Sequence, residues 1–280
     1  MFFRKNIIRE KAPDAIEKLI CESVAVTDKG PLRANNEDTY KLIRLSQPDD
    51  ILVAMVADGM GGHNAGEEAS YLACEVMSDL IQEQLLYRNE YGKVLEAAIH
   101  AAHAEIQNAA EQNETRKGMG CTLTCALIAN NLLYMAHVGD SRLYFWDSAQ
   151  LKQLSDDQTI VNEMFKKGKI TEEEKDHHEM KNILMQALGS DIRLTPQIIH
   201  RGIPVKKNDC IFLCTDGVHD VLKKEEIKML MEMEDIGFAK ECLSALAYKR
   251  NVADNFSAII LKYTVAKGAG CNTKELNAVL

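Results

Sequence analysis

The sequence predicts an α+β protein, because short apolar runs typical of buried strands are interspersed with longer amphipathic segments typical of helices. The apolar runs cover residues 51–57, 121–128, 132–138, 210–215 and 256–263. One amphipathic segment begins after residue 66, and three others cover residues 93–113, 223–233 and 236–250. Asn130 and Asn131 separate two apolar runs, a spacing typical of a hairpin with a two-residue turn.

The composition is that of an ordinary globular protein with one large domain or two small ones. Its 280 residues are 46% hydrophobic. The formal net charge of −9 argues against nonspecific binding to nucleic acid, which requires clustered lysine and arginine. No apolar stretch has the length of a membrane span, and residues 1–5 lack the apolar core of a secretory signal. We therefore expect a cytoplasmic protein with neither a nucleic-acid nor a membrane partner.

The eight cysteines are expected to be buried and reduced. Cys121 and Cys125, and likewise Cys210 and Cys214, lie within apolar strand-like runs rather than in paired Cys-x-x-Cys knuckles. This setting favours thiols that pack as small apolar groups over zinc ligands or disulfides.

A carboxylate stands at the end of the first apolar run. Behind Asp58, glycines interrupt regular structure before a helix begins; they are Gly59, Gly61, Gly62 and Gly66. Glycine beside the acid allows positive φ and a close approach of the main chain to whatever Asp58 binds. A nucleotide-binding loop is the alternative, but the Gly-Lys-Ser/Thr end of a P-loop and the spacing of a dinucleotide fingerprint are both missing. An acid on a glycine loop fits a hard divalent cation better than a bare phosphate.

The segment before this loop carries a second group of charges. Residues 1–21 are expected to form an N-terminal arm, and a strand-like pattern begins at Ser23. Arg33, Glu37 and Asp38 lie within six residues, at the start of another strand. Taken alone, this cluster is typical of a solvated turn.

Three further acids adjoin apolar strands. Asp140 follows residues 132–138 after one glycine, Asp216 directly follows the run 210–215, and Asp254 precedes the run 256–263. Between them, residues 155–182, here called the flap segment, lose all alternation and are dense in charge. This pattern predicts a mobile, solvated insertion or short helical flap of the kind that often borders a site.

Strand ends in stacked sheets converge on one edge, so these acids are expected to meet. Carboxylates that meet there raise one another's pKa values unless divalent cations neutralise them. Because no His/Cys cluster accompanies them, the ligands are oxygens, which favours Mg²⁺ or Mn²⁺ over Zn²⁺. Two such ions about 3.5–4 Å apart make a shared water acidic enough to attack phosphorus, with Asp58 as their natural bridge. Arg33 offers a guanidinium for the charges of a phosphate monoester.

Six ordered motifs resemble those of the metal-dependent protein phosphatases of type 2C (the PPM family), and most closely those of its bacterial-type branch. The motifs are Asp28-x-Gly30-x-x-Arg33-x-x-Asn36-Glu37-Asp38, Asp58-Gly59-Met60-Gly61-Gly62-His63-x-x-Gly66-Glu67-x-Ala69-Ser70, Gly120-Cys121-Thr122, Gly139-Asp140-Ser141-Arg142, Thr215-Asp216-Gly217-Val218-x-Asp220 and Asp254-Asn255. The resemblance covers about residues 22–262.

The resemblance implies a four-layer α-β-β-α sandwich, in which two central antiparallel β-sheets are flanked by helix pairs and the metals lie in a cleft at one sheet edge. We expect a catalytic domain over residues 22–263, with the flap segment beside the cleft, and a C-terminal tail over residues 264–280.

The resemblance also implies a role for each acid, carried over position by position. Asp58 bridges two metals, and Arg33 holds the substrate phosphate. The remaining positions complete the metal shells: Asp216 and Asp254 at one metal, Glu37 and the Gly59 carbonyl at the other, Asp38 through metal-bound water, and Asp140 with Asp216 at a more weakly bound third metal.

The chain departs from the family pattern in the flap segment and after the Asp-Gly step. Asp157-Gln158-Thr159 replaces Asp-His-Ser, and His178-Glu179-Met180-Lys181-Asn182 replaces His-Pro-x-x-Asn. Met60 stands where members outside the bacterial branch carry a proton-donating histidine. The proton donor to the leaving group is therefore either His63 or metal-bound water, and His63 suits a capping or packing role in the loop equally well.

These features together predict a serine/threonine protein phosphatase that uses Mn²⁺ or Mg²⁺. A metal-bridging hydroxide would attack the phosphorus of phosphoserine or phosphothreonine directly, without a phosphoenzyme. Its partners would be phosphorylated proteins, substrates of a serine/threonine kinase. Two alternatives stay open: an inactive relative that binds phosphoproteins, and a hydrolase of small phosphoesters. The complete set of expected metal carboxylates disfavours the first, whereas the sequence discriminates poorly against the second.

Overall fold

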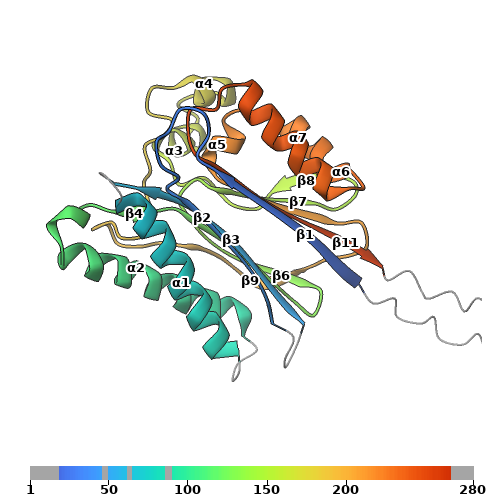
Figure 1. Cartoon of the computed structure of the whole chain (residues 1–280), viewed down its shortest axis with the longest axis horizontal. Coiled ribbons are helices and arrows are strands. Elements are labelled where there is room, and N and C mark those ends of the chain that lie inside the picture. The colour runs from blue at the N-terminus through green and yellow to red at the C-terminus, as the bar shows by residue number, and fades with distance from the viewer. Residues whose placement is uncertain (1–18, 46–49, 62–64, 86–89, 266–280) are drawn as a thin grey trace, which may run out of the picture.

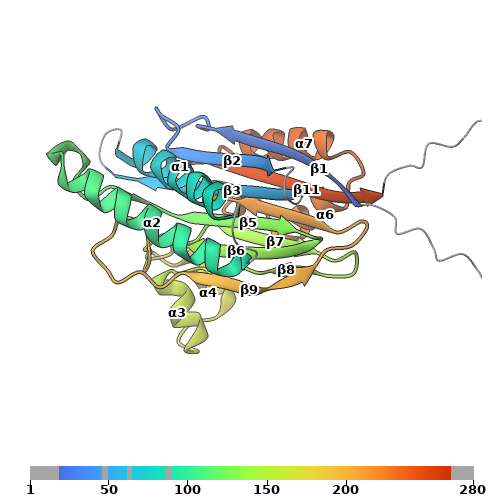
Figure 2. The ribbon, with the colours of Figure 1, turned by 90° about the horizontal axis from the view of Figure 1, so that it is seen from below.

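The computed structural model describes residues 19–45, 50–61, 65–85 and 90–265. Its elements form four layers, with two β-sheets in the middle and a pair of long helices on the outer face of each sheet (Figures 1 and 2). Every paired strand in both sheets runs antiparallel to its neighbours. The predicted α+β sandwich is therefore confirmed.

Each sheet is built from strands that are distant in the sequence. The first sheet contains, in order, β1 (Leu19–Asp28), β11 (Phe256–Val265), β10 (Cys210–Cys214), β7 (Arg142–Trp146) and β8 (Leu151–Gln153). The second contains, in order, β2 (Asp38–Leu45), β3 (Ile51–Met60), β5 (Leu123–Ala129), β6 (Leu132–Val138) and β9 (Gln197–Pro204), and β4 (Gly120–Cys121) pairs with the end of β3.

Strand β3 shows why the central strands are continuously apolar. Its side chains alternate between two cores, because successive residues of a strand point to opposite faces of the sheet. Val53 and Met55 pack in the core beneath the helices, whereas Leu52, Ala54 and Val56 pack in the core between the two sheets. Since both faces are covered, neither face of the strand tolerates polar residues.

The outer layers are amphipathic helices that bury one stripe each. Helices α1 (Ala65–Leu85) and α2 (Tyr91–Glu111) cover the second sheet, and α6 (Lys224–Glu232) and α7 (Ile236–Lys249) cover the first (Figure 1). The shorter helices are a 3₁₀ turn (Glu114–Arg116), α3 (Ile160–Lys166), α4 (Glu172–His177) and α5 (Asp216–His219).

The predicted hairpin is present between β5 and β6. Asn130 and Asn131 have φ values of 52° and 58°, the left-handed conformation that a tight two-residue turn requires. Other boundaries differ from the prediction. Strand β1 begins at Leu19 and β11 ends at Val265, so both enter the predicted arm and tail; the rest of the arm and tail lies outside the described residues.

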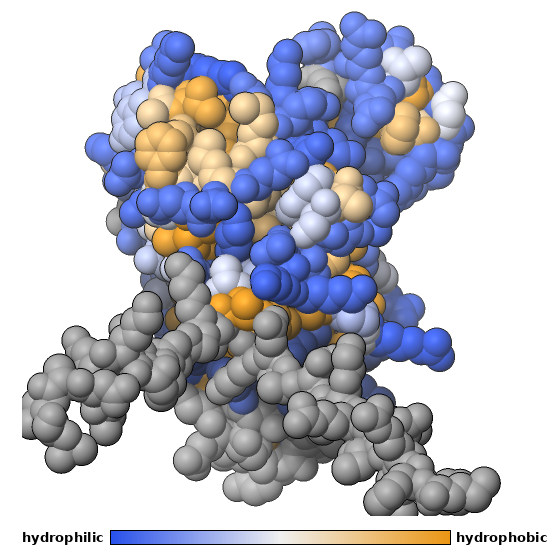
Figure 3. Space-filling view, turned by 90° about the vertical axis from the view of Figure 1, so that its right-hand side faces the viewer, coloured by the Kyte–Doolittle hydropathy of each residue, from blue (hydrophilic) through white to orange (hydrophobic). Residues whose placement is uncertain are grey.

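Among the residues that Figure 3 colours by hydropathy, hydrophilic ones predominate, and hydrophobic ones gather mainly in a patch at the upper left. Large exposed apolar residues are spread over several elements, for example Tyr71 on α1, Met229 on α6 and Phe238 on α7. Within the described ranges, no helix is both long and apolar enough to pass through a membrane. Five of the described cysteines are buried free thiols, as predicted, namely Cys74, Cys121, Cys125, Cys210 and Cys214, whereas Cys21 and Cys242 are free but only partly buried.

Candidate metal centre

The predicted acids lie close together at one end of the two sheets. Asp38 and Asp58 stand directly opposite each other where β2 pairs with β3. Asp216 begins α5 immediately after β10. The hydroxyl of Thr215 donates to Oδ2 of Asp38 at 2.8 Å, so the first sheet is joined to the second at this end. The predicted convergence of strand ends thus brings these three acids together.

The loop after Asp58 is held by main-chain contacts that only glycine permits. The amide of Gly59 donates to the carbonyl of Glu37 at 3.1 Å. A Cβ atom on Gly59 would lie 2.0 Å from the carbonyl oxygen of Gly66 and 2.6 Å from that of Glu37. Position 59 therefore requires glycine because three backbone segments approach one another closely there. A left-handed conformation is not the reason, since the φ of Gly59 is not positive.

Asp58 itself is fixed from the neighbouring strand. Its amide donates to Oγ1 of Thr122 at 3.0 Å, and its carbonyl accepts from the amide of Thr122 at 2.9 Å. The residue as a whole is partly exposed. The backbone of Asp58 is thus held firmly, and none of these contacts uses its carboxyl group.

The carboxyl groups raise one another's pKa values, as their predicted convergence requires. Burial, followed by the charges of Asp216 and Asp38, holds the pKa of Asp58 well above its usual range. Burial also raises the pKa of Asp38 to about 7 and that of Asp216 to about 6, and the charge of Asp254 adds to both shifts. Gathered negative charge in a poorly solvated place favours a proton or a cation at these groups.

Two carboxylate oxygens at this site are buried without a hydrogen bond. Oδ1 of Asp38 and Oδ1 of Asp216 accept none from any described residue. A buried acceptor without a donor is costly, and a hard cation is the natural partner for such an oxygen. The donor set therefore fits a divalent ion, although no three His, Cys, Asp or Glu side chains in the described ranges are already gathered as a ligand cluster.

Glu37 is positioned by a residue to which the sequence assigned no role. The buried Asn255 accepts from the amide of Glu37 at 2.8 Å and donates to the carbonyls of Asn35 and Lys29 at 2.8 and 3.0 Å. It thereby ties the loop that carries Arg33 and Glu37 to the start of β11. Its place in the Asp254-Asn255 motif is the sequence signal that pointed to it.

Arg33 contacts a predicted metal ligand. Its Nη2 atom lies 2.6 Å from Oδ2 of Asp254, and its Nε donates to the carbonyl of Ala253 at 3.3 Å. Burial raises the pKa of nearby Glu37, and the charge of Arg33 opposes that shift. The guanidinium thus lies beside the gathered acids.

The loop containing Asp140 is fixed on several sides. Two hydrogen bonds join Gly139 to Gln158. The side-chain oxygen of Gln158 accepts from the Gly139 amide at 2.9 Å, and the backbone amide of Gln158 donates to the Gly139 carbonyl at 2.8 Å. Oγ of Ser141 lies 2.7 Å from Oγ1 of Thr122. Burial, followed by the charge of Asp216, raises the pKa of Asp140 well above its usual range. Asp140 therefore belongs to the same electrostatic cluster as Asp216.

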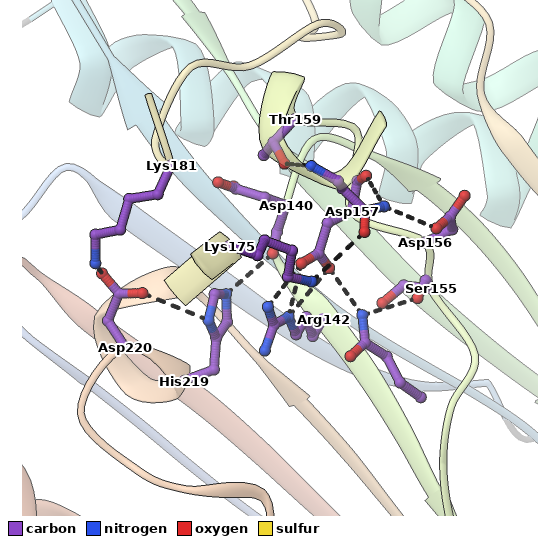
Figure 4. Close-up of polar contacts among 12 residues, drawn as sticks. Asp140, Arg142, Ser155, Asp156, Asp157, Thr159, Lys175, Lys181, His219 and Asp220 are labelled. Carbon is purple, nitrogen blue, oxygen red and sulfur yellow. Dashed lines mark hydrogen bonds and ion pairs between the residues drawn. The ribbon is translucent and has the colours of Figure 1, made fainter. Parts of the chain in front are cut away.

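The flap segment differs from its prediction at its beginning. Residues 155–162 are not a solvated insertion, because Ser155, Asp157, Thr159, Val161 and Asn162 are buried. Asp157 receives the guanidinium of Arg142, with Nη2 2.6 Å and Nε 3.0 Å from its oxygens (Figure 4). Burial alone would raise the pKa of Asp157, but the charge and hydrogen bonds of Arg142, together with the charges of His219 and Lys175, outweigh burial and lower that pKa. Because this ion pair neutralises Asp157, the charged residues 155–162 can pack as part of the protein interior.

His63 lies outside the described residues, and so does Gly62. The other predicted site positions are described: Arg33, Glu37, Asp38, Asp58, Gly59, Asp140, Asp216 and Asp254. The structure brings the carboxyls among them within mutual electrostatic reach.

Known proteins resemble this chain over most of its length. A sequence model of the family described as protein phosphatase 2C matches residues 33–250. The serine/threonine phosphatase stp of Listeria welshimeri is 35% identical over 79% of this chain and 84% of the relative. The serine/threonine protein phosphatase PstP of Mycobacterium tuberculosis is 33% identical over 86% of this chain and 45% of the relative.

A solved structure with the same arrangement contains manganese. The catalytic domain of a serine/threonine protein phosphatase PstP, crystallised with two manganese ions, superimposes with a TM-score of 0.77 and is 30% identical. The match covers 88% of this chain and 100% of that domain.

Proposed function

Because the chain belongs to the protein phosphatase 2C family, we propose that it hydrolyses phosphoserine and phosphothreonine in proteins with the help of Mn²⁺ or Mg²⁺. The observation that carries this proposal is the pair of buried oxygens on Asp38 and Asp216 that accept no hydrogen bond from the described residues. The charges of both acids raise the pKa of Asp58.

The residues of this chain divide into two ion-binding groups in the proposal. Asp58 would serve both ions, Asp216 and Asp254 would complete one group, and Glu37 with the Gly59 carbonyl would complete the other, with Asp38 acting through a water. Asp140, together with Asp216, serves a third and weaker position. When bound, the ions neutralise the substrate phosphate and make a water acidic enough to attack phosphorus directly.

The other groups orient the substrate and the ligands. Arg33 binds two phosphate oxygens through its planar guanidinium, because its side chain is 48% exposed and free to turn from Asp254 to a substrate. Thr215 and Asn255 hold Asp38 and Glu37 at fixed positions through the contacts given above. The proton donor to the leaving group is His63 or a water, and the substrates are phosphorylated by a serine/threonine kinase.

The test is hydrolysis of three substrates by the purified chain in Mn²⁺ and in EDTA. We expect phosphate release from a phosphothreonine peptide in Mn²⁺ that stops in EDTA, and much slower release from the matched phosphotyrosine peptide. A small phosphoester such as a nucleoside monophosphate distinguishes the remaining alternative.

Each outcome separates the candidate functions. Faster release from the nucleoside monophosphate than from the peptide would make the chain a small-phosphoester hydrolase. Metal-dependent peptide binding without release, in protein that circular dichroism shows to be folded, would make it a phosphoprotein-binding relative. Substituting Asp216→Asn should abolish release while the fold remains, because it removes a ligand charge and leaves the side-chain volume nearly unchanged.

A further inference from the structure

His219 links two of the acids at the candidate metal centre. It is the last residue of α5, whose first residue is Asp216. Its Nε2 atom lies 3.1 Å from the backbone carbonyl oxygen of Asp140 (Figure 4). The side chain is only 6% exposed, so water does not compete for this contact. One imidazole thus joins the Asp140 loop to the short helix that presents Asp216.

The direction of this hydrogen bond follows from its acceptor. A carbonyl oxygen only accepts, so Nε2 of His219 carries the hydrogen and donates it. The other ring nitrogen, Nδ1, is 3.8 Å from Oδ1 of Asp220, which is too far for a hydrogen bond. The ring is therefore oriented by its contact with Asp140 rather than by Asp220.

The remaining contacts of the Asp140 loop come from other directions. Gln158 holds Gly139 from the flap segment, and Thr122 and Thr124 hold Ser141 from the strand side. His219 supplies the contact from α5. The pairing of Arg142 with Cys214 aligns β7 with β10, but the contact that α5 itself makes with the backbone of Asp140 comes from His219.

The neighbouring residue extends this link to the flap segment. Nζ of Lys181 lies 2.6 Å from Oδ2 of Asp220, as Figure 4 shows. Both side chains of this ion pair are partly exposed, and such pairs stabilise little. The buried histidine, rather than the ion pair, is the contact that fixes α5 against the Asp140 loop.

We propose that His219 is a positioning residue that holds the Asp140 carboxyl in register with Asp216 and thereby sets the affinity of the weakest cation position. The proposal rests on the proposed function in one respect, namely that divalent cations bind to these acids. Residues that orient ligands through a hydrogen bond typically change metal affinity by about 10- to 100-fold when they are lost.

The test is calorimetric titration of the full chain with Mn²⁺, which reads binding without requiring turnover. His219→Gln places an amide near the position of Nε2 and keeps the donor, whereas His219→Asn is polar but too short to reach the carbonyl. We expect the Gln variant to bind every Mn²⁺ within about twofold of the unsubstituted chain. We expect the Asn variant to weaken only the weakest Mn²⁺ position, by about tenfold or more.

A remote histidine provides the matched control. His200 on β9 has a half-exposed side chain whose Nε2 lies 3.9 Å from Glu96 on α2, so His200→Asn should leave all Mn²⁺ affinities unchanged. His219→Leu is a second variant that removes both ring nitrogens. Thermal melting in EDTA confirms that each variant is folded, and the Gln and Asn pair decides the question if the Leu variant does not fold.

Three results would overturn the inference. They are Mn²⁺ binding by the Asn variant equal to that of the unsubstituted chain, equal weakening of all Mn²⁺ positions, and titration of the unsubstituted chain that shows no weak position. Failure of the proposed function has a different signature. In that case the unsubstituted chain and the His219 variants show the expected Mn²⁺ affinities, but the unsubstituted chain releases no phosphate from a phosphothreonine peptide.

Discussion

The Nη2 atom of Arg33 lies 2.6 Å from Oδ2 of Asp254, so the arginine predicted to bind phosphate is paired with an acid predicted to bind metal. The two side chains are 48% and 34% exposed. Ion pairs with this much exposure contribute about 1 kcal/mol or less, so the guanidinium can exchange Asp254 for a phosphate at little cost. The pair keeps Arg33 beside the acids while leaving it accessible to a substrate.

Replacing Arg33 should impair catalysis through the substrate phosphate. We expect Arg33→Gln to lower kcat/KM for a phosphothreonine peptide by about 10- to 100-fold at saturating Mn²⁺, since a hydrogen bond to a charged group contributes about 1.5–3 kcal/mol. Arg33→Lys keeps the charge but not the planar fork, so its loss should be intermediate. An Arg33→Gln variant with unchanged kcat/KM would remove Arg33 from the site.

Replacing Gly59 should disrupt the metal centre by steric conflict. The added Cβ of Gly59→Ala would lie 2.0 Å from the carbonyl oxygen of Gly66, and both partners are backbone. We expect unfolding free energy to fall by about 1–3 kcal/mol and phosphatase activity to be lost. Gly168→Ala is the control, because no atom lies within 4 Å of its Cβ position although its φ is +66°. That variant should remain active, and an active Gly59→Ala variant would show that the loop tolerates displacement.

The buried pair of Arg142 and Asp157 should contribute strongly to stability when one partner is removed. Asp157→Ala leaves a buried guanidinium without its carboxylate, which typically costs about 3–5 kcal/mol. Asp50→Ala breaks an exposed pair with Arg44 and should cost less than about 1 kcal/mol. Guanidinium chloride unfolding measures both values. If the two variants lose similar amounts of unfolding free energy, burial does not make the pair of Arg142 and Asp157 more important for stability than an exposed pair.

The raised pKa values predict how stability depends on pH in EDTA. The folded-state pKa of Asp38 is about 7 and that of Asp216 about 6, both above the ordinary value of 3.8. The folded chain therefore binds protons more tightly than the unfolded chain between about pH 4 and pH 7. Its free energy of unfolding should fall as pH rises through that window, each group contributing at most about 1.4 kcal/mol per pH unit.

Asp38→Asn isolates one contribution to this pH dependence. Because asparagine does not titrate, the variant should lose less stability than the unsubstituted chain between pH 5 and pH 7. Thermal or chemical unfolding at several pH values measures the difference. Identical pH dependence in the two proteins would mean that Asp38 is not a group with a raised pKa.

Local sequence patterns correctly predicted the strands that are buried on both faces. The run 51–57 became the interior part of β3 because both faces of that strand are covered. Asn130 and Asn131 marked the hairpin because few other residues adopt its left-handed conformation. Strands β8 and β9 were missed because edge strands are only partly buried, which leaves no continuous apolar run.

The supporting residues of the site could not be identified from local patterns. The contact between Thr215 and Asp38 spans 177 positions, and that between Asn255 and Glu37 spans 218. The position of Asp157 was misjudged because a charged stretch normally faces solvent, whereas Arg142 and Gln153 supply the donors that make burial of this carboxylate favourable. The acids themselves were predictable, since each stands where an apolar strand begins or ends.

The most direct test of the proposed metal centre is metal-dependent release of phosphate from a phosphothreonine peptide by the unsubstituted chain and by Asp58→Asn. We predict release that requires Mn²⁺ or Mg²⁺ and falls by several orders of magnitude in the variant, because Asp58 would serve both ion positions. Melting in EDTA must show that the variant is folded. Undiminished release by folded Asp58→Asn, or release that persists in EDTA, would contradict the assignment of this cluster as the catalytic metal centre.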